Sequence, residues 1–336
     1  MIASFNFEKS QFHSTRFYYY IVIVMLDLVN FIRTQDHFML LPPYLNVGDK
    51  VAITCPSKKL EKPMDEAVEL LESWGLQVVL GETVNSAFHQ FAGTDEFRAQ
   101  ELQGFIDDDN IKAIIAARGG YGCIRIIDQI NFSPLLKNPK WLVGFSDITV
   151  LHCALQKIGV QSIHAQMPAT IPGSSSAGLE SLRKVLFGEE VSCTYSSHIN
   201  NIQGNAQGIL IGGNLSILIS LLGSETDLDY TDKILFIEDV GEYLYAVDRM
   251  LRTLDRAGKL SKLKGLIVGV FTSLKDNPIP FGFSVEEIIY EVVKDYGFPV
   301  AFDFPAGHID DNRALILGGD CEMRVKSKLS SLILIK

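Results

Sequence analysis

The sequence predicts an α/β protein, with a parallel sheet in a first domain and strands of mixed direction in a second. From residue 50 onward, short apolar runs alternate with amphipathic stretches of about ten residues, a pattern typical of βαβ units. The length of 336 residues corresponds to about two domains. The C-terminal tail contains several strand-like runs, which favours a more mixed second domain.

Residues 39–172 are predicted to form the first domain. Strands are expected at 50–54, 77–80, 112–117 and 141–145, with helices at 63–74, 94–106, 122–130 and 147–157. Pro63 suits the first turn of its helix, and Thr94 is a typical N-cap followed by two acidic residues that the helix dipole favours. In open parallel sheets, ligands bind beyond the carboxyl ends of the strands.

Residues 173–206 do not continue the alternation of strands and helices, because small and polar residues dominate there. We predict that they form a linker that contains one short helix. The second domain is predicted over 207–336. Its expected strands are 208–211, 233–239, 263–271, a run near 299–302 and the strand-like runs of the tail, and its expected helices are 215–222 and 243–256.

Residues 1–38 carry an apolar run that ends at Asp27. The run is about ten residues long, whereas a membrane-spanning helix needs about 20. Residues 33–36 offer no small-residue cleavage site of the kind that follows a secretory signal. We therefore interpret residues 1–38 as an extension, either disordered or upstream of a natural start at Met39, and we expect no association with a membrane.

Composition and charge exclude several classes of protein. A hydrophobic content of 47% and a charged content of 21% are those of a packed protein rather than a disordered one. A net charge of −10, from 30 basic and 40 acidic residues, makes nucleic acid an unsuitable partner. Five scattered cysteines without a C-x-x-C pair favour a reducing cytoplasm over a disulfide framework. We find no metal-binding or nucleotide-binding motif, so no metal or cofactor is expected.

The string Gly144-Phe145-Ser146-Asp147 joins an expected strand to an expected helix. A serine at such a turn presents its Oγ above the sheet edge, and the Asp147 N–H points from the helix N-terminus toward any oxyanion formed there. Ser146 is therefore a candidate nucleophile. The simpler interpretation is that Ser146, or Asp147, only caps the helix.

A glycine-rich string, Arg118-Gly119-Gly120-Tyr121-Gly122, follows the third expected strand. Glycines allow close backbone approach to a bound group, and their amides can hold an anion. The spacing does not match the dinucleotide fingerprint, which argues against NAD. The string is either a structural turn or a site in which Gly119 approaches the substrate and Gly120 N–H is a second oxyanion donor.

Two residues of the second half could complete a catalytic site with Ser146. Glu238 ends an apolar strand and could orient a histidine, with Asp239 beside it as the more ordinary solvated charge. His308 lies in a loop flanked by proline and glycine, FPAGHIDDN, where a histidine is more often polar surface. His152 is expected to face away from Ser146, and His164 to shape the pocket.

Asn214 opens a helix after two glycines and is a candidate for substrate binding. Backbone amides at a helix entry can hold a substrate carboxylate, although the same string is also an ordinary helix start.

Seven short motifs follow one another in a fixed order: CPS, AGTD, RGGYG, GFSDIT, GGNL, LFIED and GHIDDN. Together they resemble the LD-carboxypeptidase family of serine peptidases, which includes the microcin C immunity peptidases. The resemblance runs from about Pro42 to the C-terminus, so residues 1–38 lie outside it.

The resemblance implies a catalytic triad of Ser146, His308 and Glu238, with the amides of Asp147 and Gly120 as the oxyanion hole. It also implies a flavodoxin- or Rossmann-like first domain, a smaller β-rich second domain and a homodimer. The triad would then be divided between the domains. Ala165 stands where many relatives have a glycine, which leaves the pocket contacts of His164 and Gln166 open.

The family's usual substrate is a murein tetrapeptide, cleaved between the L-centre of a diamino acid and a terminal D-alanine. The resemblance therefore implies a cytoplasmic serine carboxypeptidase of peptidoglycan recycling. One alternative is a peptidase of the microcin-immunity type, for which residues 271–284 could supply an aromatic clamp. The other is a non-catalytic muropeptide-binding protein, against which the presence of all three triad residue types weighs.

Overall fold

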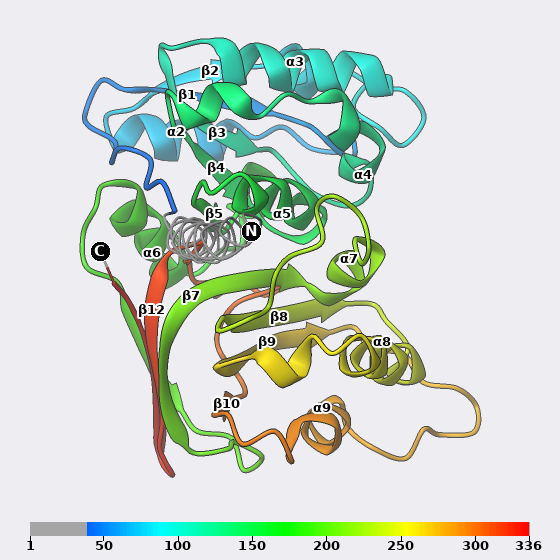
Figure 1. The fold of residues 1–336 in the computed structure, drawn as a ribbon. Coiled ribbons are helices and arrows are strands. Elements are labelled where there is room, and N and C mark those ends of the chain that lie inside the picture. The colour runs from blue at the N-terminus through cyan, green and yellow to red at the C-terminus, as the bar shows by residue number, and fades with distance from the viewer. Residues whose placement is uncertain (1–38, 336) are drawn as a thin grey trace, which may run out of the picture. The chain divides into compact units, whose positions relative to one another are not determined.

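Two sheets, one of six strands and one of seven, organise the part of the chain that the computed structural model describes, residues 39–335 (Figure 1). The interpretation of residues 1–38 as an extension lies outside the described residues. The observed α/β architecture, with one largely parallel sheet and one mixed sheet, confirms the predicted fold class at this level.

The first sheet has the strand order β11-β5-β4-β3-β1-β2. Its parallel strands are β1 (Lys50–Thr54), β2 (Gln77–Leu80), β3 (Ile111–Ala116), β4 (Trp141–Gly144) and β5 (Ser162–His164). Strand β11 (Leu315–Leu317) pairs with β5 in the antiparallel direction. The four strands predicted from apolar runs in this half are confirmed, because a parallel strand covered on both faces consists mostly of apolar residues.

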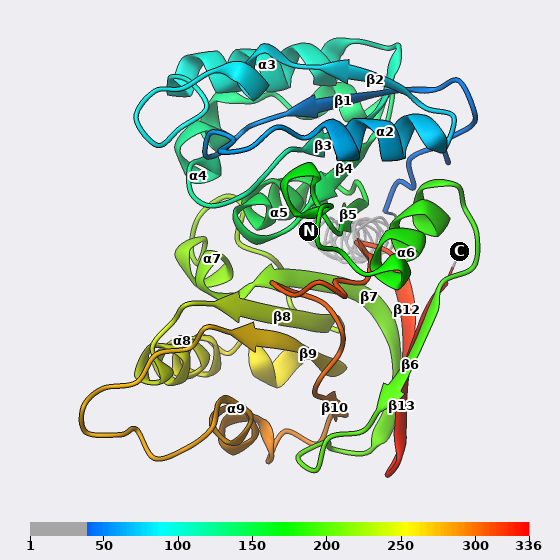
Figure 2. The ribbon, with the colours of Figure 1, turned by 180° about the vertical axis from the view of Figure 1, so that it is seen from behind.

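Helices cover both faces of the first sheet (Figures 1 and 2). They are α2 (Asp65–Ser73), α3 (Asp95–Asp107), α4 (Cys123–Ile126) and α5 (Thr149–Lys157). Val51 and Ile53 of β1 share a buried cluster with Leu71 of α2. Ala52 belongs to another buried cluster with Leu102 of α3, because successive side chains of a strand point to opposite faces.

Three helix boundaries differ from the predictions. Helix α2 begins at Asp65, so Pro63 precedes it rather than occupying its first turn. The helix predicted at 122–130 is a single α-turn followed by a 3-10 turn over Ile127–Gln129. A 3-10 turn over Ser146–Ile148 precedes α5. The cap at Thr94 is confirmed, since its hydroxyl accepts a hydrogen bond from Phe97 N at 3.2 Å.

The second sheet has the order β10-β9-β8-β7-β12-β13-β6. Four of its strands are parallel to one another: β7 (Gly204–Asn214), β8 (Ile234–Val240), β9 (Gly265–Thr272) and β10 (Val300–Ala301). Three more join through antiparallel pairs: β12 (Asp320–Val325), β13 (Leu329–Leu334) and β6 (Ser192–Ser196). Its helices are α7 (Leu215–Ser220), α8 (Leu244–Arg256) and α9 (Val285–Val293), of which α9 was not predicted.

The segment predicted as a linker is built into the fold. It contains α6 (Ser176–Leu186) and β6, which forms an edge of the second sheet by pairing with β13. The prediction failed here because β6 consists of small and polar residues, Ser192-Cys193-Thr194-Tyr195-Ser196, none of them fully buried. Composition alone does not distinguish such an edge strand from a loop.

One connection links the two sheets close to the predicted catalytic histidine. Strand β10 belongs to the second sheet and β11 to the first, so the chain crosses from one sheet to the other between Ala301 and Leu315. His308 lies on this crossing. The fold therefore carries His308 to the region between the sheets.

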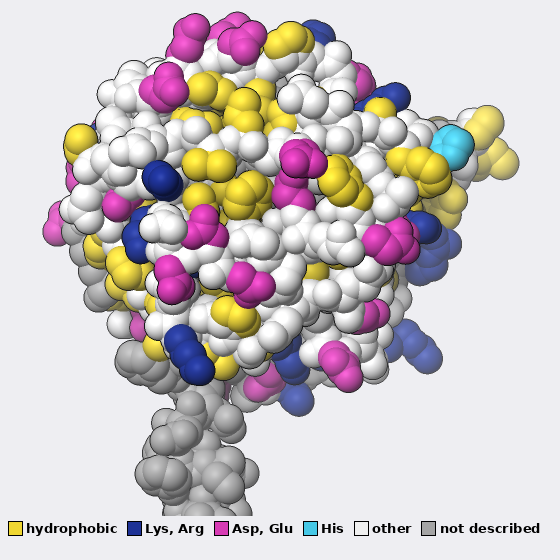
Figure 3. Space-filling model, turned by 90° about the horizontal axis from the view of Figure 1, so that it is seen from above, with side chains coloured by type: hydrophobic (Ala, Val, Ile, Leu, Met, Phe, Trp, Pro, Cys, Tyr) yellow, Lys and Arg dark blue, Asp and Glu magenta, His cyan; other side chains and the backbone are white. Residues whose placement is uncertain are grey.

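Two features of the described residues concern possible partners, namely the charges on one face and the length of the helices. On the face drawn in Figure 3, acidic side chains are dispersed and basic ones do not gather into a patch. Within residues 39–335, no helix has both the length and the apolar character needed to cross a membrane.

A buried lysine closes the C-terminal end of α3 and provides a test of this fold. Lys140 is 1% exposed, and its Nζ donates to the carbonyl oxygens of Phe105 (2.9 Å), Ile106 (2.8 Å) and Asp108 (2.6 Å). The last carbonyls of a helix have no partner within the helix, and a cation there also opposes the negative end of the dipole.

We expect Lys140→Met to lower the free energy of unfolding by about 2–4 kcal/mol, because these carbonyls would lose their donor. Lys112→Met is the control, since the Nζ of Lys112 donates to one exposed carbonyl, that of Asp109, and we expect a change within about 0.5 kcal/mol. Urea unfolding measures both. Equal effects of the two substitutions would contradict the role of Lys140.

Candidate active site

Ser146 occupies a sharp turn between β4 and the helix that follows. Its φ is +64°, in the left-handed region that a non-glycine residue seldom adopts, while Phe145 before it is extended. Strained backbone at the end of a strand is a known way to present a nucleophilic serine above a sheet. The local geometry therefore goes beyond that of an ordinary helix cap.

Ser146, His308 and Glu238 form one hydrogen-bonded chain. The Oγ of Ser146 lies 3.0 Å from Nε2 of His308, and Nδ1 of His308 lies 2.8 Å from Oε2 of Glu238. Glu238 is fully buried on β8, whereas the side chain of His308 is 22% exposed. A carboxylate can only accept, so His308 donates from Nδ1 and leaves Nε2 free to accept the hydroxyl proton of Ser146. The structure thus brings together all three predicted residues.

Gly307 permits the approach of His308 to Glu238. Its φ is +123°, and a Cβ at this position would lie 3.1 Å from both Cβ and Oε2 of Glu238. The amide of Gly307 donates to Oδ1 of Asn312 at 2.9 Å, which fixes the loop from its far side. A glycine is required here both by the backbone conformation and by the lack of space.

Asp147 joins three loops at the carboxyl ends of the strands. It is 1% exposed, and its Oδ2 accepts from the hydroxyl of Ser57 (2.6 Å) and from the amide of Cys123 (2.9 Å). Ser57 follows β1 and Cys123 is the first residue of α4, after β3. The Asp147 side chain therefore caps α4 and not its own helix, which corrects the local capping role that the sequence suggested.

Arg98, which the sequence analysis did not single out, also holds the loops after β1 and β3 together. Its guanidinium is fully buried and donates to the carbonyl oxygen of Pro56, to that of Gly122 at 3.2 Å, and to the carboxylate of Asp95. The sequence contained a sign of this role, because Arg98 lies one turn before Leu102 on the face of α3 that points into the core. A charged residue on such a face needs buried partners.

The glycine-rich string lies against Ser146. A Cβ on Gly119 would be 3.1 Å from Cβ of Ser146 and 3.4 Å from the amide nitrogen of Asp147. Among the described residues, the amides of Gly119 and Gly120 make no hydrogen bond within the protein. These free donors beside the hydroxyl suit an anion, as the sequence led us to expect.

Comparison with known proteins identifies the family. Models of the LD-carboxypeptidase N-terminal and C-terminal domains match residues 51–165 and 207–323. The chain is 35% identical over 295 residues to a "probable murein peptide carboxypeptidase" of Bacillus subtilis. This alignment covers 85% of this chain and 92% of the relative. The chain belongs to the LD-carboxypeptidase family. The resemblance predicted from seven short motifs is thus confirmed, and with it the class of the protein, a hydrolase.

Solved structures share the fold of this LD-carboxypeptidase. A muramoyltetrapeptide carboxypeptidase from Oxalobacter formigenes matches with a TM-score of 0.79 and 30% identity, over 85% of this chain and 99% of that one. The microcin self-immunity protein MccF in its wild-type apo state matches with a TM-score of 0.79 and 23% identity, over 88% of this chain and 99% of that one. At that identity, the likeness to MccF is one of fold alone.

Two residues of the predicted pocket, His164 and Asn214, are buried in contacts within the protein. His164 is fully buried, and its ring packs edge-on against Phe236 and tilted against Phe145. Burial lowers the pKa of His164 to about 3, so the ring is neutral. Asn214 caps α7 by accepting from Ile217 N at 3.2 Å, which is the ordinary helix entry. The exposed fraction is 0% for His164 and 4% for Asn214, so their roles as substrate contacts stay predictions.

His152 faces away from Ser146, as predicted. Its two ring nitrogens lie 2.8 Å from the hydroxyl of Ser162 and 2.9 Å from the carbonyl oxygen of Gly144. These contacts fix the base of the turn at Ser146.

Asp239 is not the solvated charge that the sequence suggested. It is 1% exposed, and its carboxylate accepts from Nδ2 of Asn214 (3.0 Å) and from the amides of Ser216 (2.9 Å) and Val240 (2.8 Å). Burial, helped by the negative charge of Glu238, raises the pKa of Asp239 to about 6. The second acid of the LFIED motif therefore holds the start of α7 beside the strand that carries Glu238.

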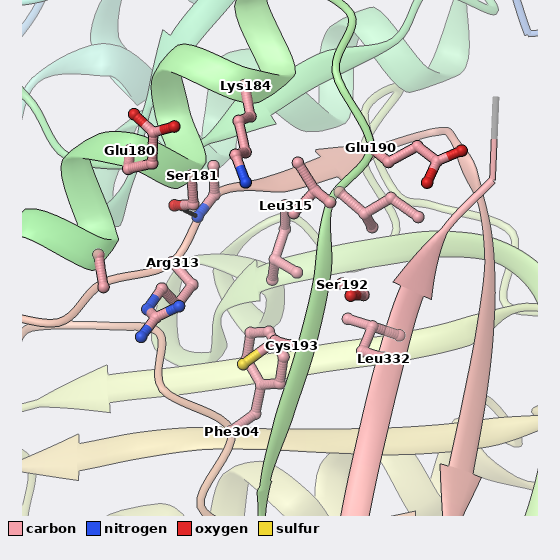
Figure 4. Close-up of a pocket in the computed structure, with 14 residues that line it drawn as sticks. Glu180, Ser181, Lys184, Glu190, Ser192, Cys193, Phe304, Arg313, Leu315 and Leu332 are labelled. Carbon is pink, nitrogen blue, oxygen red and sulfur yellow. Dashed lines mark hydrogen bonds between the residues drawn. The ribbon is translucent and has the colours of Figure 1, made fainter.

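A cavity of about 200 Å³ lies apart from the hydrogen-bonded chain, between α6, β6 and the end of β13 (Figure 4). Leu315, Leu332 and Phe304 line it, and Lys184 points toward it from α6. Arg313, on its wall, donates to Asp311 at 2.6 Å. Its lining includes none of Ser146, Glu238 and His308.

We expect Gly307→Ala to reduce activity by a factor of about 100 or more, because the new Cβ would displace Glu238 or His308 from their hydrogen bond. The matched control is Gly297→Ala, at another residue of positive φ (+81°) but with no atom within 4 Å of the added Cβ. We expect this control to cost about 1 kcal/mol of stability and to leave activity unchanged. Hydrolysis rates and urea unfolding of both variants measure this. Equal activities would contradict the role of Gly307.

The raised pKa of Asp239 predicts a dependence of stability on pH. Between pH 3.8, the ordinary pKa of an aspartate, and about pH 6, the pKa of Asp239 in the folded protein, the native protein holds a proton that the unfolded chain releases. The contribution of Asp239 to stability is thus largest below about pH 4 and is lost as the pH rises through about 6.

We expect the stability of the wild type relative to Asp239→Asn to fall by about 2 kcal/mol between pH 4 and pH 7. Taking the difference between the two proteins cancels the titration of their other carboxylates. Urea unfolding at a series of pH values measures it, and a difference that stays constant over this range would contradict the prediction.

Proposed function

We propose that this protein is a serine carboxypeptidase that cleaves the L,D amide bond before the terminal D-alanine of murein tetrapeptides. The observation that carries this proposal is the chain of hydrogen bonds from Ser146 through His308 to Glu238, in a member of the LD-carboxypeptidase family. The substrate class comes from the names of relatives, a murein peptide carboxypeptidase and a muramoyltetrapeptide carboxypeptidase.

In this mechanism the Oγ of Ser146 attacks the carbonyl carbon of the scissile amide while Nε2 of His308 takes the hydroxyl proton. His308 then gives that proton to the leaving amine of D-alanine. A water molecule, deprotonated by His308, hydrolyses the acyl-enzyme and restores Ser146. Glu238 keeps the proton of His308 on Nδ1 and stabilises the imidazolium, and its burial strengthens this interaction.

The oxyanion of the tetrahedral intermediate would accept hydrogen bonds from the amides of Asp147 and Gly120. The contact of Gly119 with Ser146 and the unused amide of Gly120 support this assignment. Donors of this kind are fixed before the reaction, so their loss typically costs a factor of about 10²–10³ in rate.

The arrangement of the enzyme in the cell and in solution is part of the same proposal. Residues 39–172 would form a flavodoxin- or Rossmann-like domain and residues 207–336 a smaller one, with the active site between them. The enzyme would act as a homodimer in the cytoplasm, on peptides released for recycling of the cell wall. The division of the hydrogen-bonded chain between the two sheets supports the placement of the site.

The microcin-immunity alternative gains no support of its own from the described residues. Within residues 271–284, Phe281 packs partly against the core and pairs edge-on with Phe283. Within residues 39–335, the aromatic ring that packs against His308 is that of Phe145, from the turn before Ser146. A non-catalytic binder would not need a serine at positive φ beside a histidine.

Incubation of the purified enzyme with a murein tetrapeptide tests the proposal. We expect release of D-alanine by the wild type and a rate at least about 10⁴-fold lower for Ser146→Ala, which lacks the nucleophile. Ser220→Ala, at an exposed residue of α7, is the control and should keep full activity. Product analysis by mass spectrometry measures both.

Two results would overturn the proposal. One is the absence of D-alanine release by the folded wild type, and the other is release that Ser146→Ala leaves undiminished. Hydrolysis of an aminoacyl sulfamoyl adenylate by a protein that leaves the tetrapeptide intact would select the immunity-type alternative.

A further inference from the structure

Lys58 places a positive charge beside the proposed oxyanion hole. It follows Ser57 in the loop after β1, and its aliphatic chain crosses Gly120. A Cβ built on Gly120 would lie 2.6 Å from Cδ and 3.2 Å from Cε of Lys58. Since Nζ is one bond of about 1.5 Å beyond Cε, the ammonium group lies within about 5 Å of the same point.

The backbone of Lys58 is fixed with respect to Ser146. Lys58 forms an isolated antiparallel bridge with Phe91, and the amide of Lys59 donates to Gln90 at 3.0 Å. On the other side, the hydroxyl of Ser57 bonds to Asp147, the residue after Ser146. The base of the Lys58 side chain is therefore held from both directions.

Within residues 39–335, the ammonium group of Lys58 forms no hydrogen bond and no ion pair, and the carboxylate of Glu61, whose pKa its charge helps to lower, is bound by Arg118. The neighbouring cations are occupied. Arg118 donates to the carbonyl oxygen of Lys59 and to Glu61, both at 3.0 Å, and Arg125 binds Asp95. Lys58 is thus a cation beside Gly120 that is available to bind an anion.

A carboxypeptidase substrate provides such an anion at this distance. The free carboxylate carbon of the terminal residue is three bonds from the attacked carbonyl carbon, a separation of about 3–4 Å. The oxyanion itself lies about 3 Å from its amide donors. A group that binds the terminal carboxylate is therefore expected within about 10 Å of Gly120, and Lys58 lies well inside this range.

We propose that Lys58 binds the free C-terminal carboxylate of the substrate and so restricts cleavage to the last residue of the peptide. This inference rests on the proposed carboxypeptidase function and assigns to it a subsite for the leaving D-alanine. A charge-assisted hydrogen bond to a carboxylate at this place would select a free terminus over an amidated or extended one.

The test compares two substrates, the murein tetrapeptide and the same peptide with a terminal D-alaninamide. We expect Lys58→Met to raise KM for the free acid by about 10- to 100-fold with kcat changed only a few-fold, and to leave the amide unaffected. Lys58→Arg, which keeps the charge, should retain most of the wild-type preference. Lys59→Met is the matched control, because Lys59 lines a different groove, beside α2, and should behave as wild type.

The possible failures are distinguishable. If Lys58→Met acts equally on the acid and the amide, or on neither, the carboxylate subsite is wrong and the carboxypeptidase function stands. If the wild type cleaves neither peptide while an uncharged fluorophosphonate still labels Ser146, the proposed function itself fails, and the subsite fails with it.

Discussion

The hydrogen bond between His308 and the buried carboxylate of Glu238 is the interaction on which the site depends. A fully buried carboxylate needs a partner, and His308 supplies it from a segment that is leaving one sheet for the other. Strand β10 fixes the start of this crossing and β11 its end. Gly307 allows the close approach, and Asn312 holds the loop from behind. The reactive geometry is therefore a consequence of how the chain passes between two sheets.

Buried polar groups fix the loops on the Ser146 side in a similar way. Asp147 binds the loops after β1 and β3, and Arg98 binds the carbonyl oxygens of Pro56 and Gly122 in the same two loops. Such groups are costly to bury, and they hold one arrangement because any other leaves them unpaired. The proposed oxyanion donors thus belong to loops whose positions are set before a substrate arrives, which is what electrostatic catalysis requires.

Much of the local structure could be predicted from the sequence. Parallel strands such as β3 and β4 are short apolar runs because they are covered on both faces, and Thr94 is a cap because its hydroxyl serves the free amides of the first turn. The predictions that failed concern residues whose burial depends on distant parts of the chain. Strand β6 is paired only through β13, and Asp239 is buried only because β7 and α7 bring donors to it. The pattern of residues along the sequence shows neither the pairing of β6 nor the burial of Asp239.

By itself, the sequence determined the α/β class, the motifs, and which serine, histidine and glutamate to consider. Each of these follows from local chemistry: periodicity, turn residues and residue type. Only the tertiary structure decided that the Oγ of Ser146 lies 3.0 Å from Nε2 of His308, although the two residues are 162 positions apart. It also decided that His164 is fully buried and that Asp147 caps a helix other than its own. Distance between side chains is a property of the packed chain, because burial and hydrogen bonding select one arrangement among the many that the same local preferences allow.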